Sequence, residues 1–335
     1  MIAGGSGIVL LTAPAAAGHS TSVLEPPNRQ EIAVGPAVIP DAPLPAGRRF
    51  AAAADAPPPG FWGGTYTTST GEQVTVYASD RYTVDQSLTQ KWANFLGSLV
   101  HGSELSSVQL LLAPLSQVEQ ICGTADVLGC YGENTIVASP DDTSGISAEA
   151  VITHEYGHHV AENRQNPPWQ TVDYGTKRWA SYEQVCKKTQ AGELFPGSES
   201  PPDYELNPGE AFAETYRVLN ERELGLPEAP WEIVDQSLYP DATALALLKQ
   251  DVLQPWTSNR TTTLRGVFLR KGRSAKSFRV TAAYDGTLTA SVRGATGMRL
   301  TLNLHQTTVC GNRTFTLRVK RTRGAGPFTL TVSRP

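Results

Sequence analysis

The sequence of 335 residues has no uninterrupted apolar run of about twenty residues, the length that a membrane-spanning helix needs. Cysteine is scarce as well: there are four, and none of them forms the C-x-x-C pattern of a zinc site built from cysteines. Hydrophobic residues make up 40% and charged residues 18%, which is an ordinary globular balance. The chain is therefore predicted to have no transmembrane segment and to be long enough for two domains.

Acidic residues are nearly absent from the last part of the chain. Residues 257–335 contain fifteen Lys and Arg but a single acid, Asp285, so their net charge is +14, whereas residues 1–256 carry −18. A basic module of this kind can hold a protein at an anionic surface or polymer, such as cell-wall polymer, lipid headgroups or nucleic acid. The alternative is that it docks on the acidic part of the same chain.

The same residues, 257–335, show a β pattern. Six short alternating runs are separated by Gly or polar turns, which predicts a small β-sandwich domain. The predicted strands are 261–269, 277–282, 286–292, 298–304, 313–321 and 327–332. Two runs, Tyr284-Asp-Gly-Thr-Leu-Thr and Gly326-Pro-Phe-Thr-Leu-Thr-Val, resemble the bacterial pre-peptidase C-terminal domains that follow secreted proteases.

The first sixty residues show no globular pattern. Residues 1–17 contain an apolar core and an Ala-x-Ala ending and resemble a secretory signal peptide without its basic start; a disordered leader is the alternative. Residues 18–60 are rich in Pro and Ala and are predicted to be a linker or a propeptide, with Arg48-Arg49 or the Ala run as plausible cleavage places. Four cysteines fit secretion: Cys122 and Cys130 are expected to form a local disulfide, while Cys186 and Cys310 either pair with each other or stay free.

The most informative segment is Val151-Ile-Thr-His-Glu-Tyr-Gly-His-His-Val. On a helix, His154 and His158 lie one turn apart and can bind one metal ion, while Glu155 faces the adjacent cleft. A catalytic zinc ion takes neutral imidazole ligands, keeps one position for water and needs a nearby base for the water proton, a role that fits Glu155. His159 projects about 100° away from His158 and is predicted either to support a metal ligand or to be structural.

A catalytic zinc ion usually has three protein ligands, so a further ligand is needed. The segment from Asn207 to Asn220 predicts a second helix, with Asn207 at the N-cap and Pro208 in the first turn. Glu210 and Glu214 share one face of this helix. The two negative charges repel each other, which favours a cation nearby. One Glu would bind zinc and the other would orient a ligating histidine. Glu210 could instead complete a capping box with Asn207.

The two helices together resemble the catalytic domain of the anthrax lethal factor family, a gluzincin group. The resemblance rests on His154-Glu-Tyr-Gly-His and on Glu210-Ala-Phe-Ala-Glu-Thr-Tyr-Arg. It implies that Glu210 is the third zinc ligand and that Glu214 supports the site. It also implies an oxyanion-stabilising tyrosine shortly before the ligand Glu, which falls on Tyr204 with a slightly different offset.

Some residues are alternatives to these assignments. Tyr204 could be purely structural, and Tyr174, Tyr182 and Tyr216 are its rivals for the oxyanion role. Asp173, fifteen residues after His158 in a Pro- and Trp-rich loop, is a rival ligand.

Residues 61–150 predict the N-terminal part of a zincin-like domain, with strands at 72–78 and 106–112 and a helix between 85 and 101. Residues 133–139 predict a further strand just before the metal-binding helix. This strand could be the sheet edge that holds an extended peptide substrate, or an interior strand without that role.

The sequence as a whole predicts an α+β protein: a zincin-like metallopeptidase domain at 61–256, followed by the basic β-sandwich domain at 257–335. We expect a secreted, monomeric, zinc-dependent endopeptidase with one Zn²⁺ per chain, ligands His154, His158 and Glu210, and a protein or peptide substrate. The alternatives are a non-proteolytic binding protein on a zincin scaffold, which would use the basic module, and a zinc amidase that acts on cell-wall peptides.

Overall fold

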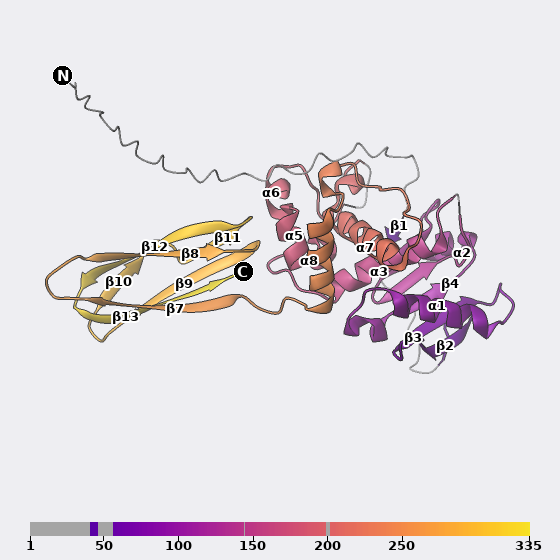
Figure 1. Cartoon of the computed structure of the whole chain (residues 1–335), viewed down its shortest axis with the longest axis horizontal. Coiled ribbons are helices and arrows are strands. Elements are labelled where there is room, and N and C mark those ends of the chain that lie inside the picture. Colours follow the sequence, from indigo (N-terminus) through magenta and orange to yellow (C-terminus); the bar gives the residue numbers. More distant parts are fainter. Residues whose placement is uncertain (1–40, 46–55, 144, 199–201) are drawn as a thin grey trace, which may run out of the picture. The chain divides into compact units, whose positions relative to one another are not determined.

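The computed structural model describes residues 41–45, 56–143, 145–198 and 202–335. The predicted signal peptide and residues 18–40 and 46–55 of the predicted linker lie outside the described residues. Helices and several β-sheets make up the described chain, which is therefore of the predicted α+β class (Figure 1). Among the described helices, none is both long enough and apolar enough to cross a membrane.

A mixed six-stranded sheet forms the centre of the first part, in the order β1-β5-β6-β4-β3-β2. Strands β3, β4 and β6 run parallel to one another, and β1 runs parallel to β5. Strand β2 runs antiparallel to β3, and β5 runs antiparallel to β6. The strands are β1 (Asp41–Pro43), β2 (Phe61–Thr67), β3 (Gln73–Ser79), β4 (Gln109–Leu112), β5 (Gly129–Gly132) and β6 (Thr135–Ala138).

Helices cover both faces of this sheet, because successive side chains of each strand point to opposite faces. Leu110 and Leu112 join the larger apolar core with helices α1 (Gln86–Ser98) and α3 (Ala148–Glu162). Leu111 faces the other way and packs with helix α2 (Leu115–Cys122). The sheet is thus buried on both sides, and its β5 end lies against α3, the helix that carries the histidines.

The remaining helices pack beyond α3. The longest, α7 (Pro208–Leu224), has Asn207 as its N-cap and Pro208 in its first turn, as the sequence predicted. It packs along α3, and the two helices lie side by side in Figure 1. The others are α4 (Thr171–Tyr174), α5 (Lys177–Tyr182), α6 (Val185–Gln190) and α8 (Ala242–Leu253), with short 3-10 turns η1 (Ser103–Ser107), η2 (Tyr204–Leu206) and η3 (Gln236–Leu238).

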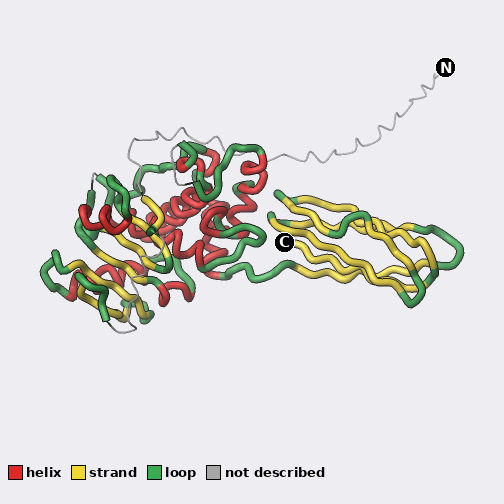
Figure 2. The backbone as a smooth tube through the Cα atoms, turned by 180° about the vertical axis from the view of Figure 1, so that it is seen from behind, coloured by secondary structure: helices red, strands yellow, loops and turns green. Residues whose placement is uncertain are grey.

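The last part of the described chain consists of strands without helices, drawn in yellow in Figure 2. A three-stranded sheet, β10-β12-β8, and a four-stranded sheet, β11-β9-β13-β7, enclose their own apolar core. Six strands correspond to the predicted runs, and β11 was not foreseen. The strands are β7 (Arg260–Phe268), β8 (Ala275–Ala282), β9 (Gly286–Gly294), β10 (Arg299–Leu302), β11 (Gln306–Val309), β12 (Arg313–Arg323) and β13 (Gly326–Arg334).

Two disulfides stabilise the chain. Cys122 and Cys130 join the end of α2 to β5, so the predicted local pairing is confirmed. Cys186 pairs with Cys310 and links α6 to the β-sandwich, which settles the alternative that the sequence left open. The junction also contains the side chain of Lys177, which donates to the carbonyl oxygens of Pro167 and Asp285.

Of the two alternatives that the sequence left open for residues 133–139, an edge strand or an interior strand, the structure has the interior strand. Residues 133–139 contain β6, which lies between β5 and β4 and so has no free side for a substrate. The sequence could not reveal this, because β5 follows the Cys122–Cys130 loop and is only four residues long. Strand β1 forms this edge of the sheet, and β5 lies between β1 and β6.

Candidate metal centre

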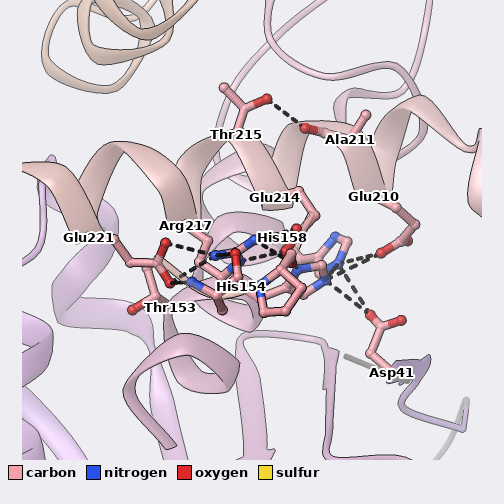
Figure 3. Close-up of polar contacts among 12 residues, drawn as sticks. Asp41, Thr153, His154, His158, Glu210, Ala211, Glu214, Thr215, Arg217 and Glu221 are labelled. Carbon is pink, nitrogen blue, oxygen red and sulfur yellow. Dashed lines mark hydrogen bonds and ion pairs between the residues drawn. The ribbon is translucent and has the colours of Figure 1, made fainter. Parts of the chain in front are cut away.

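Four side chains from three distant segments meet at one point: Asp41, His154, His158 and Glu210. One oxygen or nitrogen atom of each lies within 4.8 Å of all the others, and together they could hold a metal ion. The Nε2 atoms of His154 and His158 lie 3.3 Å and 3.2 Å from Oε2 of Glu210. Figure 3 shows the four side chains converging from α3, α7 and β1.

Glu214 fixes the orientation of His154. Its Oε1 lies 2.9 Å from Nδ1 of His154, and because a carboxylate oxygen only accepts, Nδ1 must carry the proton. When the ring is neutral, as a metal ligand must be, Nε2 of His154 is therefore the unprotonated nitrogen, and it lies 3.3 Å from Oε2 of Glu210. This carboxylate-histidine pair is the arrangement that commonly supports metal-binding histidines.

Arg217 holds Glu214 in turn. Its guanidinium donates to both oxygens of Glu214 at 2.7 Å and 2.6 Å, and to both oxygens of Glu221 at 2.8 Å and 2.7 Å (Figure 3). Burial by itself would raise the pKa of Glu214, but the neighbouring Arg217 lowers it to about 2. The positive charge of Arg217 therefore offsets part of the repulsion between Glu210 and Glu214. The sequence had assigned that role to a metal ion alone.

Glycine allows these helices to come close. A Cβ atom at Gly157, in the middle of the His-Glu-x-x-His segment, would lie 2.8 Å from Cα of Ala213 on α7. A Cβ atom at Gly129 of β5 would lie 2.5 Å from a carboxylate oxygen of Glu155. Close packing at these two points brings Glu210 and Glu214 within reach of His154, and brings Glu155 against the sheet.

Glu155 is fully buried, and among the described protein groups neither of its carboxylate oxygens has a hydrogen-bond partner. Burial raises its pKa well above the ordinary value, and the negative charge of Asp41 adds to the effect. An unpaired buried carboxyl costs free energy, and such groups concentrate at functional sites. The raised pKa favours the protonated carboxyl, so Glu155 could accept a proton only where added positive charge beside the histidines lowers its pKa.

The histidines of the metal-free molecule hold protons firmly. Burial would lower the pKa of His158, but the charge of Glu210 and hydrogen bonding to Asp41 raise it to about 10. The pKa of His154 is also raised well above its ordinary value, because its hydrogen bonds to Asp41, Glu210 and Glu214 outweigh burial. A metal ion at this point would replace those protons, so the donor set fits a divalent cation that prefers nitrogen and oxygen ligands.

Tyr204 reaches the same centre from η2. Its hydroxyl donates to Oδ1 of Asp41 and lies 3.4 Å from Oε2 of Glu210. Burial raises the pKa of Tyr204 well above its ordinary value, so the hydroxyl keeps its proton. The rival tyrosines are engaged elsewhere: Tyr216 donates to the Val100 carbonyl, and Tyr182 donates to Asp241.

Other predicted residues lie outside the cluster. Asp173 belongs to the short helix α4 and lines the cavity beside the metal centre. It is not one of the four residues whose ligand atoms meet there. Tyr174 stacks on Trp169. His159 is buried, and its Nε2 donates to the carbonyl of Glu104 at 2.9 Å, which is the structural one of its two predicted roles.

The capping-box alternative for Glu210 is not observed. The side-chain oxygen of Asn207 accepts from the backbone of Gly209 at 2.9 Å and caps α7. The backbone N–H of Asn207 is bound by the Tyr204 carbonyl, and not by Glu210. Glu210 is thereby left to face the histidines.

Sequence reasoning missed Asp41. The residue lies in the Pro/Ala-rich segment, where no periodicity or spacing marks it as a ligand. The one available signal is an acid flanked by Pro40 and Pro43, which favour an extended chain that could pair with a strand.

Comparison with protein-family models, with curated proteins and with solved structures gives no match to this chain. The function of the centre therefore has to follow from its own residues.

Proposed function

We propose that this chain is a secreted zinc-dependent endopeptidase with a zincin-like catalytic domain. One observation carries the proposal: two imidazoles and the Glu210 carboxylate meet at one point, beside the buried and unpartnered carboxyl of Glu155. Nitrogen and oxygen donors in this number are the ligand set of catalytic zinc. The two disulfides support an extracellular location, because such bonds persist in oxidising compartments.

His154, His158 and Glu210 would hold the ion, and a bound zinc ion would acidify water and polarise a peptide carbonyl. Glu155 then accepts the proton of the attacking water and delivers it to the departing amine. Glu214 and Arg217 keep the His154 ring oriented and in one tautomer. The Tyr204 hydroxyl is close enough to donate to the negative oxygen that develops on the carbonyl.

Metal content is the first measurement, because it does not depend on knowing the substrate. We expect about one zinc ion per chain in the wild type. Glu210→Ala should lose the ion, whereas Glu214→Ala should retain it with roughly 10- to 100-fold lower affinity. If Glu214→Ala loses the metal and Glu210→Ala does not, the ligand assignment is reversed. A chain without zinc would instead favour the non-proteolytic binding protein.

Glu155→Gln tests the base. The variant should fold and bind zinc but hydrolyse casein about 10²- to 10⁴-fold more slowly, since the proton acceptor is gone. Glu149→Gln, in the first turn of the same helix, is the matched control and should keep full activity. Unchanged hydrolysis by Glu155→Gln would reject the mechanism.

A further inference from the structure

Strand β1 occupies the edge of the central sheet. Asp41, Ala42 and Pro43 pair in parallel with β5, and the backbone N–H of Leu44 donates to the Tyr131 carbonyl at 2.9 Å. Without β1 the sheet would end at β5, with one side of its backbone unpaired. An exposed sheet edge of this kind is the usual place for an extended peptide to add as a further strand.

The groove beside this edge leads to the metal centre. A cavity of about 290 Å³ lies there, and its walls include Tyr131, His158, Glu210 and β1 itself. Leu44 packs over Gly132, where a Cβ atom would lie 2.8 Å from that of Leu44. Residues 41–45 therefore lie in the groove as a bound peptide would.

The backbone of residues 41–45 is only weakly bound in the groove. Only three residues of β1 are paired, and Pro43 has no N–H to donate to the sheet. Ala42 and Leu44 are only partly buried against the smaller apolar core. Among the described strands, β1 pairs on one side only, whereas β3 and β4 pair on both, so β1 can leave the sheet more easily than they can once the contacts of Asp41 are broken.

The carboxylate of Asp41 is directed at the metal ligands. Its Oδ2 lies 3.5 Å from Nε2 of His154 and 3.4 Å from Nε2 of His158 (Figure 3). Its Oδ1 accepts a hydrogen bond from the Tyr204 hydroxyl. One side chain thus engages the ligand cluster and the predicted oxyanion donor together. The group that faces the imidazoles is a side-chain carboxylate, which is not a hydrolysable bond.

We propose that residues 41–45 are a built-in occupant of the substrate groove, and that Asp41 takes the metal position needed by water, so that the full chain is a latent form of the enzyme. The proposal rests on the function proposed above. Three protein ligands leave a position for water, and a fourth ligand, the Asp41 carboxylate, would fill it. Tyr204, bound to Asp41, is also withheld from a substrate carbonyl. Removal of the Asp41 carboxylate frees both.

The test uses the full chain and its Asp41→Ala variant, each loaded with Co²⁺ in place of zinc for spectroscopy and with Zn²⁺ for casein hydrolysis. The visible absorption of bound Co²⁺ should differ between the two proteins, because Asp41→Ala replaces a carboxylate ligand by water. Hydrolysis should rise about tenfold or more, as expected when a tethered occupant at roughly millimolar effective concentration is lost. Asp80→Ala removes an exposed acid that is not part of the ligand cluster and should change neither reading.

The Co²⁺ spectra and the casein hydrolysis test latency and peptidase activity separately. Identical Co²⁺ spectra in wild type and Asp41→Ala overturn the ligand role of Asp41, whatever the activity. Equal hydrolysis by both zinc-loaded proteins overturns latency but leaves the peptidase standing. If both bind metal and neither hydrolyses casein, the peptidase proposal fails and the blocking role falls with it.

Discussion

His154 and Glu214 are 60 residues apart in sequence and share a buried hydrogen bond of 2.9 Å between Nδ1 and Oε1. The bond joins α3 to α7 and selects the ring nitrogen that faces the other ligands. Its strength depends on Arg217, which donates to Glu214 and to Glu221 from a fully buried position. The metal centre is therefore supported by a series of hydrogen bonds and ion pairs that runs from His154 through Glu214 and Arg217 to Glu221.

Arg217→Met should destabilise the protein by about 3–5 kcal/mol, because it leaves two buried carboxylates without their cation. The free energy of unfolding in urea measures this effect. Arg222→Met, five residues along the same helix and involved in an exposed pair with Glu228, is the control and should cost less than about 1 kcal/mol. A similar loss in both variants would contradict the role given to Arg217.

Gly157→Ala should separate α3 from α7. Alanine favours a helix by about 1 kcal/mol relative to glycine, but the added Cβ would meet Cα of Ala213 at 2.8 Å. Overpacking of this kind costs about 1–3 kcal/mol, so the steric effect should win. We expect a lower melting temperature and weaker zinc binding. Gly64→Ala, where a Cβ meets nothing within 4 Å, is the control; equal melting temperatures for both variants would refute the close approach.

Lys177 should make stability depend on alkaline pH. Burial lowers its pKa to about 8, below the ordinary value of 10.5. Between these pH values the unfolded chain binds more protons than the folded one, so stability rises with pH across that window. The stability of the wild type relative to Lys177→Met should therefore increase from pH 8 to pH 10.5. Melting curves of the wild type and of Lys177→Met, compared at each pH in this range, measure it; a stability difference that does not rise with pH would contradict the buried position of Lys177.

Tyr204→Phe should lower casein hydrolysis in the Asp41→Ala background by about 10²-fold, the usual cost of losing one oxyanion donor. Zinc content should stay the same, because Tyr204 is not part of the ligand cluster. Tyr182→Phe, which removes an exposed hydroxyl bound to Asp241, is the matched control. Full activity of Tyr204→Phe would leave that residue with a structural role only.

The basic β-sandwich exposes nearly all of its cations: Arg321 and Arg334 are partly buried, and the other Lys and Arg are exposed. If it binds an anionic polymer, the full chain should be retained on such a polymer at low salt and released as salt screens the charges. A variant with Arg279→Ala, Arg318→Ala and Lys320→Ala should elute at clearly lower salt. The control removes three exposed cations from the first part of the chain, at Arg81, Lys91 and Lys187. Equal elution of the two variants would favour a non-specific charge effect.

The sequence by itself determined the local features of this protein. The His154-Glu155-x-x-His158 helix, the capped start of α7 and most strands of the β-sandwich follow from periodicity and from capping residues, which act over a few positions. The Cys122–Cys130 pairing follows from a short loop. All of these signals are carried by neighbours in the chain, so one sequence is enough to read them.

Only the tertiary structure decided which side chains share a centre. The choice of Glu210 as the residue facing the histidines, and of Glu214 as the partner of His154, depends on how closely α7 packs on α3 at Gly157. Asp41 contacts Tyr204 across 163 residues, and β1 rather than residues 133–139 forms the edge of the sheet. Such contacts arise from packing and strand order between distant segments, and no local pattern records them.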